Sequence, residues 1–128
     1  MKAMLDTHAF LWWNGDDIQL PERARHVIAG GGEIYFSVVC GWEIVIKAAK
    51  GRLLLPESAD VYVRTRLEHY GFRVLPIELS HVLQTYKLPH LHNDPFDRLL
   101  VAQSQLERLP LITGDTEIAR YGVDIIWE

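Results

Sequence analysis

The sequence predicts an α/β protein with a parallel sheet that carries helices on both faces. Short segments rich in strand-forming residues alternate with longer segments of helical periodicity. Glycine and proline mark most of the boundaries between these segments. Strands that alternate with helices form parallel sheets, and ligands of such sheets bind at the carboxyl ends of the strands.

The first half of the chain contains signals for two strands and four helices. Pro21 suits the first turn of a helix, and the glycines at 30–32 end it. A stripe of apolar side chains followed by Gly51 predicts a helix over 38–50. The expected elements are a strand ending at 4–5, a helix from 6–7 to 14–15, a helix from 21 to 30, a strand over 33–37, and helices over 38–50 and 59–70.

The second half continues the alternation. Pro76 ends the strand over 72–77 or places it at an edge of the sheet. Asp94, Pro95 and Asp97 give the strongest helix start, with an acidic cap, a proline at the first helical position and a second acid in the first turn. The expected elements are a strand over 72–77, helices over 78–86 and 94–108, a strand over 110–113, a short helix after 114–115, and a last strand over 123–127.

Length and composition favour one domain spanning 1–128. The chain is 48% hydrophobic and 23% charged, and no segment is long and apolar enough to cross a membrane. The start of the chain lacks the apolar region of a signal peptide, and the single cysteine, Cys40, agrees with a reducing compartment, so we expect a cytoplasmic protein. The net charge of −4 argues weakly against nucleic-acid binding, unless an acidic site first binds cations.

Four acidic residues occupy related places in this predicted fold. Asp6 and Asp115 each follow a strand, Asp97 lies in the first turn of a helix, and Glu43 lies about one turn into the helix after strand 33–37. Carboxylates that converge at one sheet edge repel one another, and a divalent cation such as Mg²⁺ relieves that repulsion. Each acid alone also has a structural interpretation, either as a helix cap or, for Glu43, as an ion-pair partner of Lys47.

Three hydroxyl side chains lie beside these acids. Thr7, Ser37 and Thr113 would orient carboxylates or waters, or would cap strand ends and helices.

The sequence resembles the PIN-domain nucleases, and more narrowly the toxins of VapBC-type toxin–antitoxin pairs. The match covers nearly the whole chain, and four motifs occur in the family's order. They are MLDTHAFLWW at 4–13, the segment 37–53 with its WEI core, DPFDRLLVA at 94–102, and TGD at 113–115. The resemblance implies a PIN-like three-layer α/β/α sandwich with a central parallel sheet. It also implies metal ligands at Asp6, Glu43, Asp97 and Asp115.

The activity implied by this resemblance is that of an endoribonuclease dependent on Mg²⁺ or Mn²⁺. The expected partners are an RNA substrate, an antitoxin protein that blocks the site, and a second copy of the chain in a homodimer. Lys47 and Arg98 would support the acids or contact phosphate. One departure from the family pattern is Gly41, which would loosen the helical turn carrying Glu43.

Other interpretations of the sequence compete with a nuclease. A PIN-like module that binds RNA or a partner without cutting is one, and a phospho-accepting receiver domain is another, although no aspartate follows strand 72–77. His90 and His92 fit a solvated loop better than a zinc site. Trp12 and Trp13 are expected to serve as core or dimer contacts rather than as surfaces for base stacking.

Overall fold

The structure of the protein is a computed structural model that covers residues 1–128. Five strands form one parallel sheet in the spatial order β3-β2-β1-β4-β5. The strands are β1 (Lys2–Leu5), β2 (Glu33–Ser37), β3 (Arg73–Leu75), β4 (Leu111–Ile112) and β5 (Ile125–Ile126). The helices are α1 (Thr7–Asn14), α2 (Glu22–Ala29), α3 (Val38–Ala49), α4 (Ala59–Tyr70), α5 (Leu79–Thr85), α6 (Pro95–Glu107) and α7 (Thr116–Ala119).

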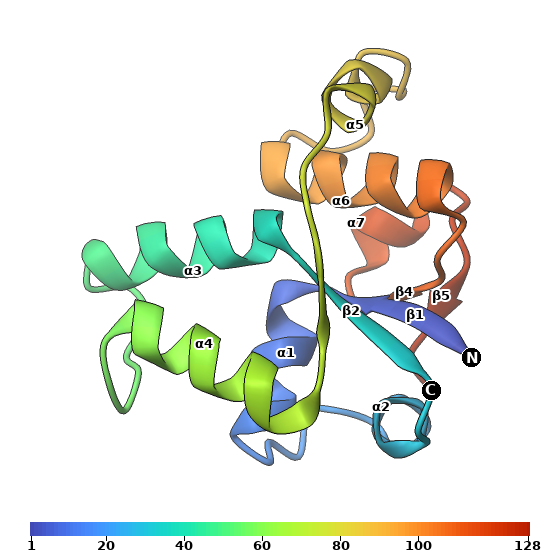
Figure 1. Cartoon of the computed structure of the whole chain (residues 1–128). Coiled ribbons are helices and arrows are strands. Elements are labelled where there is room, and N and C mark those ends of the chain that lie inside the picture. The colour runs from blue at the N-terminus through green and yellow to red at the C-terminus, as the bar shows by residue number, and fades with distance from the viewer.

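Helices cover both faces of the sheet, as the sequence predicts. Figure 1 shows α6 and α7 on one side of the strands and α1 and α2 on the other, with α5 extending outward from α6. The predicted three-layer α/β/α sandwich with a central parallel sheet is therefore confirmed. None of the seven helices is both long and apolar enough to span a membrane.

The strands at the sheet edges are shorter than the sequence indicates. The expected strand over 72–77 contracts to β3 at one edge, which agrees with Pro76 ending it there, because proline has no backbone N–H to donate to a neighbouring strand. The expected strand over 123–127 contracts to β5 at the other edge. In β3 three residues pair with β2, and in β5 two residues pair with β4.

The core lies on both faces of the central strand β1, and its aromatic centre is Phe10. The Phe10 ring lies 4.5 Å from Phe36, 6.2 Å from Tyr62 and 6.3 Å from Phe72, measured between centroids. These contacts join α1 to β2, to α4 and to the segment before β3. They fix α1, and with it the residue that begins α1, relative to the carboxyl end of the sheet.

Helix α3 is continuous through Gly41, contrary to the looser turn that the sequence predicts. A Cβ atom at Gly41 would lie 3.4 Å from the ring of Phe36, which is an ordinary contact distance. Cys40, the preceding residue, is fully buried, and burial raises the pKa of its thiol. Its Sγ lies 3.6 Å from the carbonyl oxygen of Leu5, so this cysteine contributes to packing rather than to exposed thiol chemistry.

Candidate metal centre

Asp6 lies directly after β1 and begins α1. Its Oδ1 accepts a hydrogen bond of 2.7 Å from the backbone N–H of Ala9, so it caps the helix, as one interpretation of the sequence predicts. Its side chain is nevertheless almost completely buried, and burial raises its pKa despite a hydrogen bond from Thr113. Asp115 adds repulsion that acts in the same direction. Capping and membership of an acidic site are therefore compatible at this position.

Glu43 projects from α3 and is held on both of its oxygens. The Thr7 hydroxyl donates to Oε1, and the Lys47 ammonium lies 2.8 Å from Oε2. The carboxylate is only 6% exposed, so its charge is balanced mainly by Lys47, one helical turn away. Thr7 and Lys47 thus both contact the Glu43 carboxylate, and the Lys47 pair agrees with the structural interpretation of Glu43.

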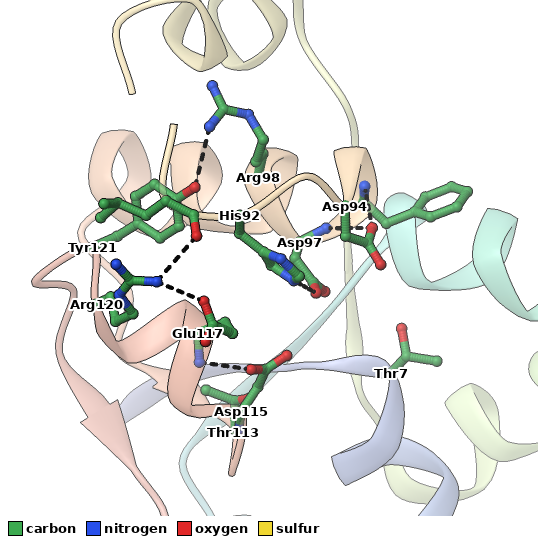
Figure 2. A network of polar contacts seen from close by, with 12 residues as sticks. Thr7, His92, Asp94, Asp97, Arg98, Thr113, Asp115, Glu117, Arg120 and Tyr121 are labelled. Carbon is green, nitrogen blue, oxygen red and sulfur yellow. Dashed lines mark hydrogen bonds and ion pairs between the residues drawn. The ribbon is translucent and has the colours of Figure 1, made fainter. Parts of the chain in front are cut away.

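The start of α6 presents two further acids and a histidine. Asp94 Oδ1 accepts hydrogen bonds from the backbone N–H groups of Phe96, at 2.8 Å, and Asp97, at 3.2 Å. This cap fixes the first turn of α6 and therefore the direction of the Asp97 side chain. Asp97 Oδ2 in turn lies 2.8 Å from Nε2 of His92 (Figure 2).

The environment of Asp97 strongly disfavours its charge. Burial is the largest cause, and repulsion from Asp94, Asp115 and Glu43 adds to it, so the pKa of Asp97 rises to about 7. The hydrogen bond from His92 opposes this rise, and the same contact raises the pKa of His92. An acid in this state gains much from a neighbouring cation, because a cation stabilises its ionised form.

Asp115 reaches the same region from the carboxyl end of β4. Its Oδ1 accepts a hydrogen bond of 2.8 Å from the backbone N–H of Glu117 and so caps α7. Its own N–H donates to the hydroxyl of Thr113 at 3.0 Å, which orients the turn between β4 and α7. In Figure 2, Asp97 and Asp115 extend from their separate helices toward the same space, with Thr7 on its far side.

These acids come from four elements and lie within electrostatic reach of one another. Asp97 is affected by Glu43 and Asp115, and Asp6 by Asp115. The tightest group of ligand atoms, all within 4.8 Å of one another, belongs to His92, Asp94 and Asp97. The donors are carboxylate oxygens of acids that are at least partly buried, and burial raises the pKa of Asp6 and Asp97, so this chemistry fits a hard divalent cation. Of the four metal ligands that the resemblance implies, Asp6, Glu43, Asp97 and Asp115, this tightest group contains Asp97.

Two residues that the sequence analysis suggests as supporting residues of the site, Ser37 and Arg98, make their hydrogen bonds elsewhere. The Ser37 hydroxyl donates to Oε1 of Gln103 at 2.5 Å and accepts from the backbone N–H of Val39. The Arg98 guanidinium donates to backbone carbonyl groups near the end of α5, including that of Thr85 at 2.8 Å, and to the Tyr121 hydroxyl at 3.1 Å. Both side chains fasten the elements that carry the acids.

His92 belongs to this centre, although its sequence context favours a solvated loop. The side chain is only partly exposed and contacts Asp97 directly. The five-residue interval between the two spans a loop and a helix start, where no periodicity indicates which side chains meet. In the sequence, only the position of His92 close to the DPFD motif indicates that it could contact Asp97.

A parallel α/β fold and an acidic centre at the carboxyl ends of its strands together define the general class of this protein. Comparison with family models narrows the class, since the PIN domain model matches residues 3–124. The chain therefore belongs to the PIN domain family, and the resemblance found in its motifs is confirmed. A search of curated protein sequences finds no significant match.

Solved structures with the same fold cover nearly the whole chain. The DNA-bound VapBC structure from Salmonella typhimurium superposes with a TM-score of 0.72 at 20% identity, covering 98% of this chain and 96% of that one. The VapBC2 structure from Rickettsia felis, bound to a promoter DNA fragment, gives 0.70 at 15% identity with complete coverage of both chains. The FitAcB structure from Neisseria gonorrhoeae gives 0.68 at 20% identity, covering 98% and 96%. At these identities the similarity is one of fold.

Proposed function

We propose that this chain is a divalent-metal-dependent endoribonuclease, and that residues 1–128 act as one catalytic domain. The observation that carries the proposal is the partly buried cluster around Asp97, where ligand atoms of His92, Asp94 and Asp97 lie within 4.8 Å of one another and Asp115 and Glu43 add repulsion. Such a cluster costs free energy in the metal-free protein and is expected of a site that binds cations. Membership of the PIN domain family supports the same conclusion.

The four acids have a common task in the proposed reaction. Asp6, Glu43, Asp97 and Asp115 would hold Mg²⁺ or Mn²⁺. When bound, the cation supplies activation of the attacking water and stabilisation of the departing oxygen of a phosphodiester. Thr7 and Lys47 keep the Glu43 carboxylate oriented toward the site, and His92 holds one oxygen of Asp97 so that the other remains free.

Replacing Asp97 by asparagine tests the proposal directly. The variant keeps the shape of the side chain but loses a ligand charge, so we expect cleavage of single-stranded RNA with Mn²⁺ to fall by at least about 100-fold. The measurement is the rate of cleavage of labelled RNA on a gel. Asp124→Asn, which removes an exposed acid outside the site, is the matched control and should keep full activity. Equal activity of Asp97→Asn and wild type would refute the mechanism.

We further propose that the nuclease is the toxin of a toxin–antitoxin pair and acts in the cytoplasm. A toxin–antitoxin complex from Klebsiella pneumoniae contains a chain with the same fold, which supports a protein partner for this chain as well. An apolar groove between α3 and α4, which includes the exposed side chains of Trp42, Val45 and Val74, offers a surface for that partner. Co-expression with the product of a short neighbouring reading frame should then suppress RNA cleavage, and unchanged cleavage would count against this assignment.

A homodimer is the third part of the proposal. Helix α5 exposes Leu79, Val82 and Leu83, and Tyr86 follows it with 93% exposure, so an apolar face is open to a second copy. We expect Leu83→Asp to convert a dimer into a monomer in light scattering after size-exclusion chromatography. Lys87→Glu, a charge change beside this face, should leave the mass unchanged. A monomeric wild-type protein would contradict the homodimer.

A further inference from the structure

A hollow beside the acids combines carboxylates with aromatic rings. Its lining includes the two acids Asp6 and Asp115. It also includes three ring-bearing side chains and one glutamine, which are His8, Trp12, Trp127 and Gln19. Helix α1 supplies His8 and Trp12, the segment between α1 and α2 supplies Gln19, and the residue after β5 supplies Trp127. The hollow therefore adjoins the proposed metal centre on the side of β4 and β5.

The three rings form a continuous aromatic wall. His8 and Trp12 have centroids 5.3 Å apart with planes inclined at 32°, and Trp12 and Trp127 have centroids 5.9 Å apart at 46°. A third ring inserted between two stacked rings needs a separation of about 7 Å, since each carbon contact takes about 3.5 Å. A planar ligand would therefore stack on the open side of the wall, where Trp12 and Trp127 are only partly buried.

The wall and the acid Asp115 depend on the same tight turn. Gly114 connects β4 to Asp115, and a Cβ atom there would lie only 2.7 Å from Cζ2 of the Trp127 indole. No side chain fits in that space, so glycine at 114 lets the indole lie close against the backbone that positions Asp115. The turn thus sets a rigid aromatic surface next to a candidate metal ligand.

We propose that this hollow is a base-binding subsite for single-stranded RNA, in which a nucleobase stacks on the Trp12–Trp127 wall. The inference rests on the proposed nuclease function. A nucleotide carries a phosphate and a base, and the lining of the hollow combines acids that would bind a cation with an aromatic surface. Gln19, which also lines the hollow, provides an amide donor and acceptor for the edge of a base.

The chemistry of the hollow favours a nucleotide over an apolar protein segment as its occupant. An apolar side chain would cover Asp6 and Asp115 without compensating their charges. A phosphate bridged by a divalent cation compensates them, and stacking then takes place without sequence preference because every base has a π-face. The Trp12 ring, expected from the sequence to pack in the core or at a dimer contact, packs against the core with one part and lines this hollow with another.

The test compares two RNA probes with the same number of phosphates. One is a fluorescein-labelled decamer of uridine, and the other is a decamer of abasic ribose phosphate. Dissociation constants are measured by fluorescence anisotropy in Mn²⁺, at times when a gel shows the probes to be intact. We expect wild type to bind the uridine decamer about 5- to 100-fold more tightly, the range that stacking of one base provides.

Variants of Trp12 separate stacking from packing. Trp12→Phe keeps an aromatic face and should keep most of this preference, whereas Trp12→Leu remains apolar without a π-face and should bring the two dissociation constants together. Trp13→Phe, on the same helix but 5.6 Å from the Tyr70 ring, is the matched control and should keep the preference. His8→Ala, at an exposed position that does not endanger the fold, should reduce it about twofold.

Wild-type protein that binds the two probes equally, or binds neither, would overturn the subsite. An unchanged preference in Trp12→Leu would also overturn it. RNA cleavage in Mn²⁺ is measured in parallel, so that absence of the probe preference with intact cleavage refutes the subsite alone. Absence of Asp97-dependent cleavage refutes the nuclease function on which the subsite rests.

Discussion

Asp97 and His92 give the metal-free protein a characteristic dependence on pH. Both pKa values are raised in the folded state, that of Asp97 to about 7. Between the ordinary pKa of an aspartate and about 7, the folded protein therefore binds more protons than the unfolded chain. The free energy of unfolding consequently falls as the pH rises through this range.

We expect the free energy of unfolding to decrease by about 2 kcal/mol between pH 5 and pH 8 in the presence of a chelator. This decrease is smaller than the free energy that corresponds to the whole pKa shift of Asp97, because the Asp97 side chain is partly solvated. The carboxyl groups with lowered pKa, Glu33 and Asp60, are ionised in both states across this range. The measurement is urea denaturation at each pH. Asp97→Asn should flatten the profile, and added Mn²⁺ should restore stability mainly at pH 8. A wild-type profile that rises toward pH 8 would contradict the assigned pKa values.

The elements that carry the acids are joined through a buried polar network. Gln103 of α6 accepts from Ser37 at the end of β2, donates to the carbonyl oxygen of Pro76 at 3.2 Å, and lies 3.3 Å from Nδ1 of His81. His81 Nε2 in turn contacts Glu107 at 2.8 Å. One side chain of α6 thus fixes its position against β2, α5 and the segment after β3, and so places the start of α6 above the sheet edge.

Replacement of Gln103 by leucine should lower the free energy of unfolding by about 2 kcal/mol. The change keeps a similar volume but removes the acceptor of the Ser37 O–H group and the side-chain donor to the Pro76 carbonyl oxygen. Gln105 also lies on α6, and it makes an exposed hydrogen bond to Gln84 of α5. Gln105→Leu removes this bond and should change the free energy of unfolding by less than about 0.5 kcal/mol. Urea denaturation measures both, and equal effects of the two variants would show that the network contributes little.

At the scale of the whole molecule, the acidic charge makes RNA binding dependent on cations. The chain has a net charge of −4, so phosphate contacts by its basic residues alone give little affinity. A divalent cation in the acidic centre reverses the local field and gives the phosphate a binding partner. RNA affinity should accordingly be negligible in a chelator and appear with Mn²⁺.

A pair of variants with the same change in net charge tests this dependence. Asp6→Asn and Asp124→Asn each remove one negative charge, but only Asp6 belongs to the acidic centre. We expect Asp6→Asn to weaken binding of labelled single-stranded RNA in Mn²⁺ by about 10-fold, and Asp124→Asn to leave it unchanged. Tighter binding by both variants would show that overall charge, rather than the bound cation, governs affinity.

The local signals of the sequence identify most elements, and its motifs supply the four acids that are proposed as metal ligands. The cap at Asp94-Pro95 and the glycine at position 51 act within a few residues, so they can be recognised along the chain. The lengths of β3 and β5 could not be predicted in this way, because pairing at a sheet edge depends on a neighbour that is distant in sequence.

By itself, the sequence determined the α/β alternation, the motifs of the PIN domain family and the acids that follow its strands, since each depends on residue type and short spacing. Only the tertiary structure decided that His92 contacts Asp97, that Gln103 joins three elements, and that Trp12 and Trp127 form one wall. These contacts join residues across loops or up to 115 positions apart, from 12 to 127. The strand order β3-β2-β1-β4-β5 creates the wall. It places the carboxyl ends of β1 and β5 at the same end of the parallel strands, with only β4 between them.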